Sequence, residues 1–442
     1  MKNSELPRST ESYALTMKST FSLNSKLEFD SIKERLKRYA TSDLGKQLVD
    51  EIAPFSDLRV LQEELDRVTE CKILLETDEP CPLEGLKDVR LAIHKASIED
   101  SFITAPELRS IFEIQRTCRL VHQFFKKRPG RYLRLSEIAA GIHVDRVLEY
   151  NIEQAIDENG TVKDSASKEL REVRRSIISR SDELRVRLDE ILKDLSKQGY
   201  AQEEIITTRE GRMVIPVKVE HKHHVPGFIH SSSATGATVF VEPAETLEMN
   251  NEIRSLRFSE QRQIEKILRA LTAQVRQAAT QIHSNVNILA QLDLDFAKAR
   301  YSIEIIGCRP EITSQGPLRL LQARHPILLQ KHKRDDVVPI DIELGKKFNT
   351  LIITGPNAGG KTVALKTVGL LSLMAACALH IPASADSQIP LFRQIFIDIG
   401  DEQSIENDLS SFTSHLLNLK QIIEQVDGCS LVLIDEIGAG TD

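Results

Sequence analysis

The chain has 442 residues, of which 41% are hydrophobic and 28% charged, with a formal net charge of -7 at pH 7. This length suits two to four domains, and the acidic balance argues against indiscriminate nucleic-acid binding while leaving room for local basic faces. The six cysteines show no C-x-x-C pair, so reduced thiols are expected rather than a metal or disulfide framework. With no apolar run of membrane-spanning length and no signal-peptide pattern, the sequence predicts a cytoplasmic protein without a membrane partner.

The first part of the chain is predicted to be helical. A polar leader covers residues 1–26, and residues 27–160 carry apolar residues at helical spacing with few strand signals. Helical patterns are evident at 57–75, 105–127 and 144–156. These patterns predict an all-helical core.

Residues 161–310 are predicted to form a lever with a small sheet at its tip. A charged helical pattern runs over 165–199, which at 1.5 Å per residue makes a rod of roughly 50 Å. Two pairs of β-type runs follow at about 203–243, with Glu210 and Gly211 as a hairpin signal. A second long helical pattern then runs from about Ala244 to beyond Gln281.

A phosphate-binding pattern stands near the end of the chain. The apolar run 351–354 is interpreted as a strand, and the next eight residues match G-x-x-x-x-G-K-[ST]. Lys361 would neutralise the β and γ phosphates, and the Thr362 hydroxyl suits Mg²⁺. The predicted nucleotide-binding residues are Gly355, Pro356, Asn357, Ala358, Gly359, Gly360, Lys361 and Thr362.

A second motif follows about seventy residues later. The apolar run 431–434 is predicted to be a buried parallel strand, and Asp435 and Glu436 come directly after it. Asp435 is placed to hold Mg²⁺, and Glu436 to orient and deprotonate the attacking water. Between the two motifs, residues 407–416 begin a serine-rich helix whose N-terminus would either face an anion or be an ordinary serine cap.

Together these motifs resemble the ATPase of the MutS family. The matching segments are Gln-Ala-Arg-His-Pro at 322–326, the loop 354–362, Ser-Ser-Phe at 410–412 and residues 435–441. The resemblance implies ATP and Mg²⁺ as cofactors, with Glu436, Lys361 and Asn357 in catalytic roles. It also implies that Ser410 reaches across a homodimer interface to the γ-phosphate held by the other subunit. The expected fold is therefore α with α/β, in which 311–442 form the N-terminal part of a P-loop (ABC-type) ATPase domain.

The predicted tip of the lever resembles the second branch of that family, which we call the MutS2 branch. The segments that carry this resemblance are Arg-Met-Val-Ile-Pro-Val-Lys at 212–218 and Ser-Ser-Ser-Ala-Thr-Gly-Ala-Thr at 231–238. In this branch two subunits form a clamp that encloses DNA. The expected phosphate contacts are Arg209, Arg212, Lys218 and Lys222, each of which would otherwise be a solvated charge.

The order of segments narrows the expected function. The chain enters the helical core without a separate mismatch-reading domain, and Phe-Val-Glu at 240–242 is interpreted as a chance match to the mismatch reader's pattern. Branched recombination intermediates are therefore the expected DNA, and suppression of homologous recombination the expected process. The alternatives are an ATPase that contacts rRNA and splits collided ribosomes, a mismatch-repair damage sensor, and, more weakly, a chromosome-organising coiled-coil ATPase.

The family's switch histidine, dimerising segment and nuclease domain would all lie after Asp442. We therefore expect 1–442 alone to hydrolyse ATP weakly and to lack nuclease activity. Two smaller clusters suggest other chemistry: His221, His223 and His224 for a metal, and the serines 231–233 for a nucleophile. Neither has a partner at a convincing spacing, so a solvated loop and a polar surface are the preferred interpretations.

Overall fold

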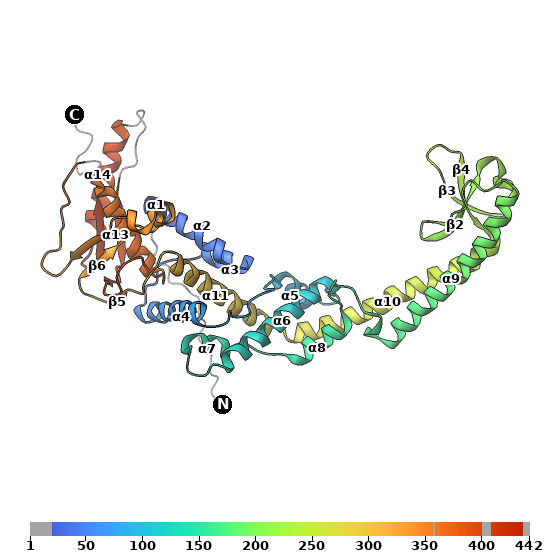
Figure 1. Ribbon diagram of the computed structural model, residues 1–442, viewed down its shortest axis with the longest axis horizontal. Helices are drawn as coiled ribbons and strands as arrows, with labels where there is room; N and C mark the ends of the chain where they lie inside the picture. The colour runs from blue at the N-terminus through green and yellow to red at the C-terminus, as the bar shows by residue number, and fades with distance from the viewer. Residues whose placement is uncertain (1–19, 357–358, 400–407, 436–442) are drawn as a thin grey trace. The chain divides into compact units, whose positions relative to one another are not determined.

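The structure is a computed structural model that describes residues 20–356, 359–399 and 408–435 (Figure 1). The chain divides into two compact units, each with a hydrophobic core of its own. Unit 1 comprises Met1–Asp88, Thr117–Val144 and Ser284–Asp442, and unit 2 comprises Val89–Arg116 and Asp145–His283. The polar leader, 1–26, is described only from Thr20, where the first helix begins.

Helices make up most of unit 1. They are α1 (Thr20–Lys26), α2 (Phe29–Tyr39), α3 (Asp43–Asp50), α4 (Leu58–Thr77), α7 (Leu133–Ala140), α12 (Pro326–Lys331), α13 (Lys361–Ala376) and α14 (Asp408–Gln425). Unit 2 contains α5 (Arg90–Ser97), α8 (Arg146–Ala155), α9 (Lys168–Lys197) and α10 (Leu247–Gln277). Two further helices, α6 (Ala105–Lys126) and α11 (Ala279–Glu304), include residues of both units.

Side-chain caps fix where several of these helices begin. The Asp57 carboxylate accepts hydrogen bonds from two amides in the first turn of α4, and Asp145 does the same for α8. The Ser167 hydroxyl accepts from the Leu170 amide at the start of α9. Such caps satisfy amides that the helix itself leaves unpaired. The helical predictions at 57–75, 105–127, 144–156 and 165–199 are confirmed by α4, α6, α8 and α9.

Unit 1 also contains two small sheets. Strands β9 (Gln394–Asp398) and β10 (Ser430–Ile434) form a parallel pair in which Ile434 lies opposite Asp398. The other sheet has the order β5-β8-β6-β7, made from β5 (Glu311–Thr313), β8 (Gln388–Pro390), β6 (Leu318–Ala323) and β7 (Ile340–Leu344). The strand predicted at 431–434 is thus confirmed, with a carboxylate directly after its end.

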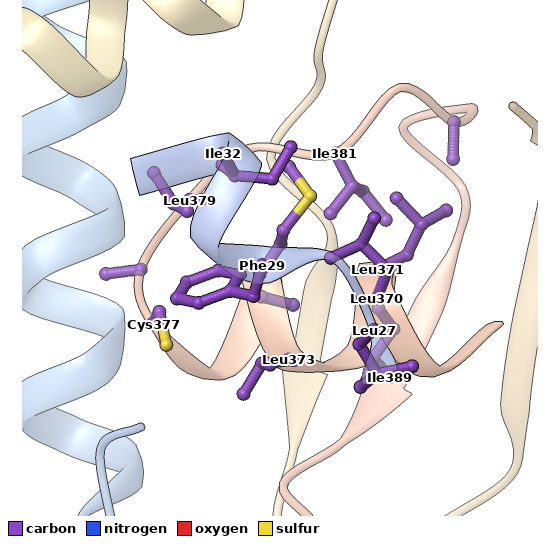
Figure 2. Close-up of a cluster of buried hydrophobic side chains, with 14 of the residues drawn as sticks. Leu27, Phe29, Ile32, Leu370, Leu371, Leu373, Cys377, Leu379, Ile381 and Ile389 are labelled. Carbon is purple, nitrogen blue, oxygen red and sulfur yellow. The ribbon is translucent and has the colours of Figure 1, made fainter. Parts of the chain in front are cut away.

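The core of unit 1 joins the beginning of the described chain to its last third. Figure 2 shows Leu27, Phe29 and Ile32 gathered with Leu370, Leu371 and Leu373 of α13 and with Ile381 and Ile389 beyond it. Leu27 and Ile32 are fully buried, as are Leu370 and Leu371. This burial holds α13 in place, and α13 begins at the predicted phosphate loop.

Unit 2 contains the lever and the clamp. Figure 1 shows α9 and α10 running alongside each other, with β2, β3 and β4 at one end of the pair. The sheet is antiparallel with the order β1-β2-β4-β3, from β1 (Thr207–Arg209), β2 (Arg212–Lys218), β3 (Gly227–Ser232) and β4 (Thr238–Pro243). The predicted hairpin is confirmed, because Glu210 and Gly211 both adopt the positive φ that a tight β-turn of this kind requires.

Two sequence predictions differ from the structure. Residues 351–354 form no strand, and Ile352 is 79% exposed. A strand needs a neighbour for its backbone hydrogen bonds, and β9 and β10 pair with each other instead. The second lever helix is also not continuous past Gln281, because α10 ends at Gln277 and α11 starts at Ala279.

Candidate nucleotide site and clamp surface

The phosphate loop is the first part of the candidate site. Gly355 and Gly360 adopt φ values of 152° and 79°, which a side chain would strain, and Gly360 is the cap residue of α13. Lys361 and Thr362 therefore stand in the first turn of α13, whose amide groups and positive dipole end suit an anion. The Lys361 Nζ lies 2.5 Å from the Gly355 carbonyl oxygen, so the ammonium reaches back across the loop. Asn357 and Ala358 lie outside the described residues.

The two predicted Mg²⁺ ligands meet in the structure. The Thr362 Oγ1 donates to Asp435 Oδ2 at 2.5 Å, although 73 residues separate the two in sequence. Asp435 directly follows the buried strand β10, and Thr362 belongs to the first turn of α13. A hydroxyl and a carboxylate oxygen side by side form the kind of all-oxygen donor set that Mg²⁺ prefers. The residues present therefore fit the cation that the motif implies.

Asp398 is a buried carboxylate at the same end of the parallel strand pair. It ends β9, and its main-chain carbonyl accepts a hydrogen bond from the Asp435 amide at 2.9 Å. Its side chain accepts from His415 Nδ1, which lies 3.1 Å from both oxygens, and from Asn418 Nδ2 at 3.2 Å. His415 and Asn418 belong to α14, whose first turn contains Ser410. Asp398 thereby connects Asp435 to the helix that carries the Ser-Ser-Phe motif.

Sequence reasoning missed Asp398, although a signal was present. The residues 395–398 read Ile-Phe-Ile-Asp, an apolar run that ends in a carboxylate like the run before Asp435. Two other predicted residues cannot be located as side chains. Glu436 lies outside the described residues, and Ser410 is described only as part of the α14 backbone.

The 322–326 segment lies in unit 1 and packs inward. His325 is buried, which lowers the pKa of its imidazole, and it precedes Pro326 at the start of α12. Arg324 Nε donates to the Val337 carbonyl oxygen at 3.1 Å. These contacts give the motif a structural part in unit 1.

Known proteins resemble both the last segment of the chain and nearly its whole length. The model of MutS domain V matches residues 351–442, which contain the loop, α14 and β10. The "Endonuclease MutS2" of Pelotomaculum thermopropionicum is 41% identical over 417 residues, that is 94% of this chain and 52% of that protein. The proteins of the same name from Geobacillus sp. strain WCH70 and Symbiobacterium thermophilum are 42% and 39% identical, each over 94% of this chain and about half of their own length. The chain belongs to the MutS family, in its MutS2 branch. It spans about half the length of the curated relatives it matches.

The clamp of this MutS2 chain contains the four residues predicted to contact DNA. Arg209 lies with its guanidinium 4.2 Å from the centre of the Phe240 ring. Lys218 Nζ donates to the Gly199 carbonyl oxygen at 2.8 Å. Lys222 lies in the short 3-10 helix Val219–His224 and is half-buried.

Arg212 is the exception among these four, because its guanidinium faces into the clamp. Its Nη1 donates to Glu242 at 2.6 Å and its Nη2 to Asn251 at 2.6 Å. Glu242 is 1% exposed and also lies 2.6 Å from His230 Nε2. An arginine that neutralises a buried carboxylate has few donors left for phosphate, so we remove Arg212 from the DNA contacts. The Phe-Val-Glu segment thus supplies an internal ion pair.

The histidines of the clamp pack against a tyrosine. The rings of Tyr200 and His221 are stacked with centres 4.5 Å apart, and His224 lies 4.8 Å from the same tyrosine. Within the described residues, no group of three or more histidines, cysteines or carboxylates is arranged to hold a metal ion. No described helix is both long and apolar enough to cross a membrane.

Proposed function

We propose that this chain binds ATP with Mg²⁺ and uses the nucleotide to control a grip on DNA. The observation that carries the proposal is the contact between Thr362 and Asp435, which joins the phosphate loop to the end of β10. When bound, Mg²⁺ would neutralise charge that develops between the β and γ phosphates of ATP. Thr362 and Asp435 would hold the cation, and Lys361 would swing from the Gly355 carbonyl to the phosphates.

The remaining roles in the proposal come from the family motif. Glu436 would position and deprotonate water, Asn357 would orient the γ-phosphate, and Ser410 would act on the nucleotide of the other subunit in a homodimer. The Asp398 contacts support this reading, because they fix α14 relative to Asp435. Hydrolysis would then be linked to movement of the lever helices.

The proposed target is branched DNA, such as a recombination intermediate, and the proposed process is suppression of homologous recombination. Arg209, Lys218 and Lys222 are the residues of the clamp that we retain as phosphate contacts. A clamp that reads the shape of DNA needs no wedge between bases, and the Phe-Val-Glu segment at 240–242 is unsuited to mismatch reading because Glu242 is buried. Binding of rRNA during ribosome rescue and recognition of mismatches become outcomes of the test.

The nucleotide site is tested by the Lys361→Ala variant. It removes the ammonium that would face the β and γ phosphates, so we expect at least a tenfold loss of ATP affinity, measured by equilibrium dialysis in the presence of Mg²⁺. Lys347→Ala is the matched control, since it removes the same charge from an exposed residue of the preceding loop. Equal affinity in the two variants would contradict the site.

The target is tested by comparing ligands at one salt concentration. Gel shifts with a four-way junction, a linear duplex of the same length, a mismatched duplex and stalled ribosomes distinguish the alternatives. We expect the junction to bind tightest and Arg209→Ala with Lys222→Ala to weaken it. Tighter binding of ribosomes or of the mismatched duplex than of the junction would contradict branched DNA as the target.

A further inference from the structure

A groove of about 630 Å³ runs along one face of α10 in unit 2. Its lining from α10 includes Asn251, Arg254, Phe258 and Arg262, which recur every three or four residues and so share one face of the helix. Phe102, from the segment between α5 and α6, also lines it. The groove therefore belongs to a single rigid helix and the loop packed beside it.

Charges on α10 are divided between two faces. Glu252 and Glu260 pair with arginines of α9, at 3.2 Å to Arg180 and 2.7 Å to Arg174. The carboxylate in the groove itself, Glu265, is bound by Arg269 at 2.8 Å.

Arg254 and Arg262 differ from Arg174 and Arg180 of α9, which are paired with carboxylates. Both are exposed, and within the part of the chain that the structure describes neither pairs with a carboxylate. Eight residues separate them, which corresponds to about 12 Å along the helix. The groove therefore presents two guanidinium groups with uncompensated positive charge.

An exposed aromatic ring lies between these two arginines. Phe258 is 56% exposed, and the Arg254 guanidinium lies 5.7 Å from the centre of its ring. Arg262 Nε donates a hydrogen bond to the Phe258 carbonyl oxygen at 3.4 Å, so the second guanidinium lies close to the helical turn that contains Phe258. Leaving a phenylalanine ring in water is unfavourable, and a flat apolar ligand would relieve it.

We propose that this groove binds a single-stranded segment of nucleic acid, with phosphates on Arg254 and Arg262 and an unpaired base stacked on Phe258. Charged grooves that alternate with aromatic rings bind single strands in this way. A duplex would satisfy the arginines but not the ring, because its bases are already stacked on one another. The proposal rests on the proposed grip on nucleic acid and adds that unpaired segments, such as those at a branch, are held by the lever.

The test measures fluorescence anisotropy of labelled oligonucleotides with the 442-residue chain at one salt concentration. Its arms are a short oligothymidylate, an oligouridylate of the same length and a duplex. We expect Phe258→Ala and the double variant Arg254→Ala/Arg262→Ala each to weaken single-strand binding about tenfold, and Phe258→Tyr to retain it. The matched control, Arg171→Ala/Arg175→Ala, removes two exposed arginines from α9 and should leave it unchanged.

Two results would overturn the proposal: single-strand binding by Phe258→Ala that equals the unmodified chain, or equal losses for single strand and duplex in every variant. Weaker binding of either the oligothymidylate or the oligouridylate by these variants supports the proposal. The ratio of the two affinities shows whether the groove prefers DNA or RNA. ATP binding by the same variants should be unchanged, because all the substitutions lie in unit 2. ATP binding and single-strand binding are therefore measured separately, so failure of the proposed nucleotide site is distinguished from failure of the proposed groove. Every substituted side chain is exposed, so we expect all variants to fold, and circular dichroism checks this.

Discussion

The His415 imidazole donates through Nδ1 to the carboxylate of Asp398, whose oxygens both lie at 3.1 Å. Because a carboxylate can only accept, the proton of this hydrogen bond belongs to the histidine. Asp398 is nearly fully buried, so this contact and the one from Asn418 compensate for its removal from water. The pair is thus a joint between β9 and α14.

Breaking this joint should destabilise unit 1. We expect His415→Ala and Asp398→Asn each to lower the free energy of unfolding by about 1–3 kcal/mol, because a buried polar group loses its partner. Chemical denaturation of both single variants and of the double variant gives the coupling energy between the two residues. A coupling energy near zero would show that the hydrogen bond contributes no stability, and Asn418→Ala serves as the comparison with a weaker partner.

A glycine-to-alanine change in the clamp should open its edge strand. A Cβ at Gly227 would lie 2.1 Å from the Glu242 carbonyl oxygen, which is backbone and cannot rotate away. We expect Gly227→Ala to separate β3 from β4, so that amides of 227–232 exchange hydrogen faster. Gly428→Ala is the control, because nothing lies within 4 Å of a Cβ at that residue. Unchanged exchange in the clamp would contradict the reported packing.

Removing Arg212 should destabilise the clamp more than removing Arg209. Arg212→Ala leaves Glu242 buried with His230 as its remaining ionisable partner, at a cost of about 3 kcal/mol. The double variant Arg212→Ala/Glu242→Gln should recover part of that loss, because it no longer buries the carboxylate charge. Arg209→Ala, which loses an exposed contact with Phe240 and a long hydrogen bond to the Thr208 carbonyl oxygen, should cost less than about 1 kcal/mol. Urea denaturation monitored in the clamp compares the three.

Acid should destabilise unit 1 through His380. Burial, together with the nearby charge of Lys72, lowers the pKa of His380 to about 3, from an ordinary value of 6.5. Its ring nitrogens instead meet the Ser302 hydroxyl at 2.8 Å and the Thr69 hydroxyl at 3.0 Å, which suits the neutral form. The unfolded chain therefore binds the proton first, so the stability from this group is complete above pH 6.5 and is lost as pH falls toward 3.

The measurement follows unfolding of His380→Asn and of the unmodified chain between pH 7 and pH 4.5, about the window in which only the unfolded histidine is charged. The stability difference between them should shrink by about 1.4 kcal/mol per pH unit below 6.5. His223→Asn, which changes an exposed histidine, is the control variant. A difference for His380→Asn that stays constant over this pH range would rule out this titration.

The elements that sequence predicted well depend on neighbours in the chain. The helix α9 follows from its apolar spacing and serine cap, and the β1–β2 turn from the Glu210-Gly211 pair. The meeting of Thr362 with Asp435 was predictable because both residues belong to a motif with a defined geometry. The strand predicted at 351–354 was wrong. An apolar run shows that residues are able to form a strand, but it does not show that a partner strand lies beside them.

Side-chain partners distant in sequence were not predictable. Arg212 has the charge of a phosphate contact, and only the folded sheet brings Glu242 and Asn251 to it. Asp398 lacked a motif of its own, so its link to His415 emerged only when α14 was placed beside β9. The charge of the groove on α10 likewise depends on which carboxylates of α10 pair with arginines of α9, which composition alone does not reveal.

The core in Figure 2 has a consequence for the timing of synthesis. Leu27 and Phe29 pack against residues of α13 that are about 340 positions further along the chain. At roughly 5–20 residues per second, a ribosome needs about 17–70 s to make that interval. During this time the apolar residues of α1 and α2 lack their partners on α13, whereas the residues of unit 2 are complete before α13 is made. Unit 2 can therefore fold before this core is complete, and a chaperone would have to shield the apolar residues of α1 and α2 over the whole interval.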